Sequence, residues 1–207
     1  MEEYDNLFDA VQYGSLPDVK RLIAAGEDVN ERDISDSTPI FKVEEGDIAK
    51  ALIDAGAEIH ATDEDGFTPL HSARQNESVA RVLVDAGANI SAKNRGGVVP
   101  IQLASFEVTK LLIESGADVN AIDDHGFTPL HFAADVDVAE ALIGAGAKIH
   151  IKNNWGETAS EWHNARRHLD IARVIEAHAI KVEQAKLQTT TPAAQPQPTK
   201  RKVKAYI

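Results

Sequence analysis

The side chains best suited to chemistry in this 207-residue chain are its eight histidines and its many carboxylates. Histidine binds metals and transfers protons near neutral pH. His71 and His131 lie 60 residues apart in the same Thr-Pro-Leu-His motif, and His60 and His150 end two matching segments. This regular spacing indicates that the four side chains serve a repeated structural role.

The remaining histidines and acids form no recognisable catalytic or metal-binding pattern. His163, His168 and His178 lack a zinc-type spacing, and the sequence contains no cysteine. Paired acids such as Asp123 and Asp124 fall in predicted loops, where no pocket is expected to form. The sequence also lacks a Gly-rich phosphate loop, a nucleophile elbow and an HExxH helix. We therefore expect a protein that is not an enzyme and needs no cofactor or metal.

The composition is that of an ordered, soluble protein with an acidic bias. Apolar residues make up 43% of the chain, and the formal net charge is −12. Acids are concentrated in residues 1–70, whereas residues 188–207 contain bases and no acid. The N-terminus does not resemble a secretory signal, and no apolar run could span a bilayer. We expect a cytoplasmic protein whose repeats bind neither membrane nor nucleic acid. Its acidic surface either steers a basic partner or serves only solubility.

A segment of about 30 residues recurs along the chain, which indicates a stack of similar units. Residues 65–87 read DGFTPLHSARQNESVARVLVDAG, and residues 124–146 read DHGFTPLHFAADVDVAEALIGAG. Less complete copies of the same pattern flank both segments. The predicted repeat domain covers 1–187, with units at 4–33, 34–63, 64–94, 95–123, 124–153 and 154–187. The first and last units are expected to cap the stack, and residues 188–207 to form a disordered, basic tail rich in Pro, Thr and Gln.

The residues of each unit predict a helix pair. Thr68 can cap a helix, Pro69 fits its first turn, and His71 can reach back to the cap. Val79 and Leu83 then recur at helical spacing and give the second helix one apolar face. Two helices cannot bury that face alone, so neighbouring units must stack against each other.

These residues resemble the ankyrin repeat family. The pattern G-x-T-P-L-H-x-A is complete at 66–73 and 126–133, and the ending GADVN stands at 116–120. The resemblance implies an all-α solenoid of stacked helix-turn-helix units with projecting β-hairpin fingers, and binding of other proteins through the fingers and the concave helix face. The internal units are shortened between their two helices, which predicts helix pairs shorter by about one turn.

Candidate contacts with a partner are the positions that the family leaves free. Large apolar residues on exposed fingers are unexpected unless they contact something. The position after the motif histidine, which the family turns to the concave side, becomes more apolar toward the C-terminus. The predicted partner-binding residues are Glu64, Asp65, Phe67, Arg95, Val98, Leu103, Asp124, His125, Phe127, Phe132, Trp155 and Trp162. Alternatively, the aromatic residues cover their own fingers or pack between units.

The sequence therefore predicts a non-enzymatic module that binds another protein, with a basic surface on that partner. We expect a blocker of inhibitor or immunity type that is monomeric when free. The main alternative is an adaptor that links two proteins, for which the basic tail is the only candidate second surface. An enzyme with an unrecognised site is a distant third.

Overall fold

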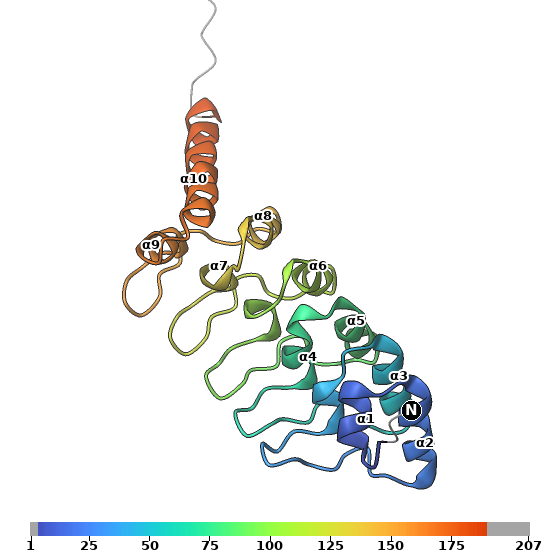
Figure 1. Ribbon diagram of the computed structural model, residues 1–207. Helices are drawn as coiled ribbons and strands as arrows, with labels where there is room; N and C mark the ends of the chain where they lie inside the picture. The colour runs from blue at the N-terminus through green and yellow to red at the C-terminus, as the bar shows by residue number, and fades with distance from the viewer. Residues whose placement is uncertain (1–3, 190–207) are drawn as a thin grey trace, which may run out of the picture.

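The computed structural model describes residues 4–189, which form one row of stacked helix pairs (Figure 1). The pairs are α1 (Leu7–Tyr13) and α2 (Leu16–Ala25); the 3-10 helix η1 (Pro39–Lys42) and α3 (Gly46–Asp54); α4 (Pro69–Ser72), continued by the 3-10 helix η2 (Ala73–Gln75), and α5 (Glu77–Asp85); the 3-10 helix η3 (Pro100–Gln102) and α6 (Phe106–Glu114); α7 (Pro129–Phe132) and α8 (Val136–Gly144); and α9 (Ala159–Ala165) and α10 (Leu169–Thr189). Long loops project from one side of the row (Figure 1). The predicted all-α solenoid is confirmed.

The core runs along the row as a line of second helices. In α5, the buried residues are Val79, Ala80 and Leu83, at the spacing of one helical face. Ala80 is fully buried, and its small side chain allows α3 and α6 to approach α5 from either side. Each buried Val or Leu contributes roughly 1.5–3 kcal/mol, so stacking supplies the stability that an isolated pair lacks.

The shortening of three internal units falls on their first helices. These span three or four residues in η1, η3 and α7, whereas α1 and α9 span seven, as do α4 and η2 together in the third unit. The internal second helices α3, α5, α6 and α8 each keep nine residues. The reason is that the missing residues precede the second helix, while the apolar set that packs the stack lies within it.

The fingers are loops, in contrast to the predicted β-hairpins. Within residues 4–189, a single antiparallel bridge joins Lys152 and Thr158. Each finger is closed by a backbone bond such as that from Asp63 N–H to Phe67 O, at 3.0 Å. The next residue, Thr68, is the N-cap of α4, and among the described fingers only the last adds a second pair, Lys152 with its N-cap residue Thr158.

Helix α10 is longer than the other helices of the described part and extends beyond the stack (Figure 1). Its buried residues Ile171, Ala172 and Ile175 lie in the part that packs on α8 and α9. The structure describes α10 as far as Thr189, the last described residue. The predicted tail lies outside the described residues from position 190 onward.

Candidate protein-binding site

Each finger is held by one acidic or amide side chain at its base. In the third unit, Asp63 Oδ1 accepts hydrogen bonds from the N–H groups of Asp65 and Phe67, at 3.0 and 2.9 Å. Gly66 has a φ of 81°, which completes the turn at little steric cost. The same pair of bonds recurs at Asp33, Asn94, Asp123 and Asn153.

Neighbouring fingers are also bonded to each other at their tips. Arg95 N–H donates to Asp65 O at 2.9 Å, and Asn154 N–H donates to His125 O at 2.9 Å. Equivalent bonds join Glu64 to Ser35 and Asp124 to Gly96. The predicted tip residues Glu64, Asp65, Arg95, Asp124 and His125 therefore lie along one continuous row.

The motif histidines connect helix starts to the next finger. His71 Nε2 lies 3.0 Å from Val98 O in the next finger. Because a carbonyl only accepts, Nε2 carries the proton, and Nδ1 accepts from Thr68 N–H at 3.1 Å. His131 makes the matching bonds to Thr128 and to Glu157 O. Burial lowers the pKa of both rings, which keeps them neutral and suited to these bonds.

An aromatic surface lies on the last two units, formed by Phe127, Phe132, Trp155 and Trp162. The Phe127 ring is at its centre, with its centroid 4.4 Å from that of Trp162, 5.4 Å from Phe132 and 5.5 Å from Trp155. Trp155 is 64% exposed and Phe132 37%, whereas Phe127 is only 7% exposed. Phe127 thus supports the rings that face water, which is in part the alternative that the sequence left open.

Comparison with known families agrees with this architecture. A family model described as ankyrin repeats, in three copies, matches residues 7–94 and 100–154. The chain belongs to the ankyrin repeat family. Ankyrin repeats are in general protein–protein interaction modules. No curated protein was found to be similar to the chain.

The other predicted contact residues of this ankyrin stack lie apart from the aromatic surface. Phe67 packs edge-on against its own His71, with ring centroids 5.5 Å apart. Phe67 and Leu103 line a hollow of about 270 Å³ between the third and fourth units, and both are half-buried. Val98 is also half-buried, in the fourth finger. The predicted apolar contact residues therefore fall into two groups, one half-buried around the third and fourth units and one in the aromatic surface of the last two units.

Arg166 is a residue of the site that the sequence analysis missed. It follows α9, and its guanidinium carbon lies 2.9 Å from the centroid of the Trp162 ring. The signal was present, since Trp162 and Arg166 are four residues apart at the end of a predicted helix. His163, next to Trp162, is buried and bonds to Leu130 O at 3.0 Å, which fixes α9 on the preceding unit.

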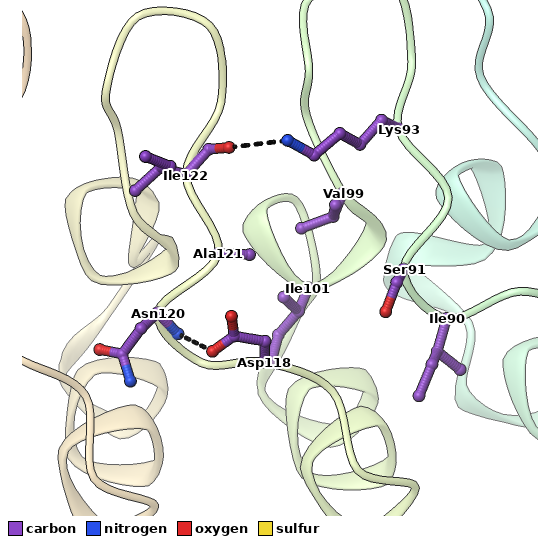
Figure 2. Close-up of a pocket in the computed structure, with 9 residues that line it drawn as sticks. All are labelled: Ile90, Ser91, Lys93, Val99, Ile101, Asp118, Asn120, Ala121 and Ile122. Atoms are coloured by element: carbon purple, nitrogen blue, oxygen red, sulfur yellow. Dashed lines mark hydrogen bonds between the residues drawn. The ribbon is translucent and has the colours of Figure 1, made fainter.

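Another hollow, of about 340 Å³, lies between the stems of the fourth and fifth fingers (Figure 2). Its polar groups are engaged with the stems themselves. Lys93 Nζ donates to Ile122 O at 3.3 Å, and Asp118 Oδ1 accepts from Asn120 N–H at 2.8 Å. The apolar part of the lining consists of Ile90, Val99, Ile101, Ala121 and Ile122. These contacts tie one ankyrin unit to the next.

The described residues show neither a metal cluster nor a membrane span. No three His, Cys, Asp or Glu side chains within residues 4–189 are grouped so that they could hold a metal ion. None of the helices in the same part of the chain combines the length and the apolar character needed to cross a bilayer.

Proposed function

We propose that this ankyrin stack binds a protein partner through its aromatic surface and blocks the partner surface that it covers. The observation that carries the proposal is the exposure of Trp155 and Phe132 around a buried Phe127. Large exposed aromatic side chains are costly in water, and in interfaces they supply much of the binding energy. In this role Trp155, Phe132 and Trp162 contact the partner, and Phe127 holds them in place.

The row of finger tips supports a basic partner. Glu64, Asp65 and Asp124 are exposed in this row, which reaches His125, whose ring lies 5.8 Å from that of Trp155. Acidic groups at the edge of an interface increase the rate of encounter with a basic surface and repel nucleic acid. We therefore propose a protein with a basic contact surface as the partner.

Rigid recognition is the proposed mechanism. Backbone bonds between the finger tips and histidine bonds between the units hold the contact residues before a partner arrives. A preorganised surface loses little conformational entropy on binding, so more of the contact energy contributes to affinity. Such a binder acts by occupying the partner's surface and needs no chemistry of its own.

An adaptor function is the second candidate. Helix α10 extends beyond α8 and α9, and its residue Ile180 is 58% exposed. This exposed part of α10 lies away from the fingers and could hold a second protein (Figure 1). An adaptor would need both surfaces at once, whereas a blocker needs only the aromatic surface.

The test compares two single substitutions on the full chain. The partner is recovered from the native cell with the unmodified chain, and its affinity is then measured for Trp155→Ala and Ile180→Ala. We expect Trp155→Ala to weaken binding at least about tenfold, as for a central interface aromatic, with little change in the melting temperature. Ile180→Ala is the matched control, because its exposure is similar. Unchanged binding by Trp155→Ala would overturn the proposal, and weakened binding by Ile180→Ala alone would favour the adaptor's second surface.

A further inference from the structure

Arg166 covers part of the aromatic surface in the protein without a partner. Its guanidinium lies over the Trp162 ring, and one of its nitrogens donates to Trp162 O at 3.4 Å, near the limit for a hydrogen bond. Arg166 is exposed. A cation on an aromatic face at an exposed position is held weakly, so this contact can be exchanged for another of the same kind.

The fingers beside this surface favour a cation from outside. Arg95 is the only Lys or Arg in the finger segments 33–37, 63–67, 94–98, 123–127 and 153–157. Of the acids in these segments, Asp124 and Glu157 belong to the two fingers that carry the aromatic surface, and neither is buried, whereas Asp33 and Asp36 already pair with Lys42 and Arg32. A basic segment of a partner is therefore attracted to the finger tips, a row that reaches His125 beside Trp155.

We infer that Trp162 forms a guanidinium subsite, which Arg166 fills until an arginine of the partner takes its place. The inference rests on the proposed function and specifies the chemistry of the partner. A guanidinium is planar and weakly hydrated, so it stacks on an indole ring while its N–H groups stay available to neighbouring carboxylates. The chain itself places this group, and not an aliphatic side chain, on Trp162.

Competition by Arg166 has a consequence for selectivity. While Arg166 is stacked, the subsite is closed, so the apparent affinity falls in proportion to the open fraction. A partner with an arginine in the right place regains the stacking contact when it displaces Arg166. A partner without such an arginine displaces Arg166 from Trp162 but forms no replacement contact there, so the competition disfavours this partner.

Intrinsic fluorescence can test this exchange, because the chain has two tryptophans, Trp155 and Trp162, and both belong to the aromatic surface. The full chain is titrated with a penta-arginine peptide and with penta-citrulline, which has a similar shape but no charge. Arg166→Ala is compared with Arg167→Ala, which removes the same charge from the next residue and leaves the stacked side chain in place. We expect the arginine midpoint of Arg166→Ala to lie at least about threefold below that of Arg167→Ala. Penta-citrulline should give no saturable change.

Three results would overturn the inference: equal midpoints for the two variants, equal responses to arginine and citrulline, or no saturable response to arginine. Arg166→Gln, which retains a long polar side chain without the charge, should shift the midpoint in the same direction as Arg166→Ala and gives a second test if alanine perturbs the end of α9. None of the three contrary results would contradict the proposed function, because that function is tested separately by the effect of Trp155→Ala on partner binding.

Discussion

At the start of several units, a side chain three residues further on accepts a hydrogen bond from the N–H of the cap residue, and the residue types of this pair differ between units. Thr68 is paired with His71, and Val99 is paired with Gln102, whose Oε1 accepts from Val99 N–H at 2.9 Å. In the second unit, Phe41 stands where the motif has histidine. Thr38 Oγ1 is consequently buried without a hydrogen-bond partner among the described residues. An unpaired buried hydroxyl destabilises a protein.

Thr38→Val should therefore stabilise the protein by about 1 kcal/mol, because it removes the unpaired hydroxyl and keeps the shape of the side chain. The fourth unit already has a valine, Val99, at the corresponding position. Urea unfolding monitored by circular dichroism measures the change. Thr68→Val is the matched control, and it should destabilise by a similar amount because Thr68 Oγ1 lies 2.9 Å from His71 Nδ1. A loss of stability in Thr38→Val would contradict this explanation.

The buried histidines make stability depend on pH. Burial lowers the pKa of His71, His131 and His163 below the ordinary value of 6.5. As the pH falls through about 6.5, the unfolded chain takes up protons that the folded chain resists. The free energy of unfolding should therefore be constant above about pH 7.5 and fall below pH 6.5, by up to about 1.4 kcal/mol per pH unit for each of these histidines.

Urea unfolding at pH 7.5 and 5.5 tests this pH dependence. The control variant is His131→Gln, because Gln102 already occupies the corresponding position in another unit. Gln102 accepts from its cap residue and donates to Phe127 O at 2.9 Å, as His131 does toward Glu157 O. Glutamine does not titrate, so His131→Gln should remain folded and show a shallower loss of stability on acidification. An unchanged pH dependence in this variant would show that His131 is not one of the responsible groups.

At the scale of elements, the turn between α9 and α10 is unlike the corresponding turns of the internal units. Arg167 adopts a φ of 65°, a left-handed conformation that glycine tolerates best. Its N–H donates to Asn164 O at 3.1 Å, and His168 N–H donates to His163 O at 2.9 Å. These two bonds form the usual glycine-based end of a helix with arginine in the glycine position.

Arg167→Gly should stabilise the protein by about 1 kcal/mol, because glycine removes the steric cost of the left-handed conformation. Thermal or urea unfolding measures the gain. Arg173→Gly within α10 serves as the control and should destabilise by a similar amount, since glycine weakens a helix interior. If both substitutions destabilise, the turn holds no strain that glycine can relieve.

The helix pairs could be predicted because their signals are local. Thr68, Pro69 and His71 specify a helix start within four residues, and Val79 and Leu83 specify the apolar face of the next helix. The finger loops were expected to be β-hairpins, whereas a bridge forms in the last of the described fingers alone; antiparallel pairing depends on the backbone geometry of each finger, which the motif does not specify.

The arrangement of the site was harder to predict from the sequence. Phe127, Phe132, Trp155 and Trp162 were all identified as contact candidates, yet the burial of Phe127 depends on rings from two units meeting in space. Arg166 could not be predicted from the motif, because it lies at the C-cap of α9, outside the positions that the motif leaves free.

At the scale of the whole molecule, the stack presents exposed rings at its C-terminal end and acidic tips along the fingers. The rings and tips are connected by the same bonded fingers, because Asn154 N–H donates to His125 O beside Trp155. We therefore propose that a partner is first attracted along the tips and then held at the aromatic surface.

Site-specific photo-crosslinking tests that claim most directly. A photoreactive benzoylphenylalanine is introduced in place of Trp155 or Phe132, and in place of Ile180 on α10 as a control of comparable exposure. Each full-length chain is then irradiated with the recovered partner. We predict a covalent complex from positions 155 and 132 and none from position 180. A complex formed from position 180 but from neither aromatic position would contradict the account.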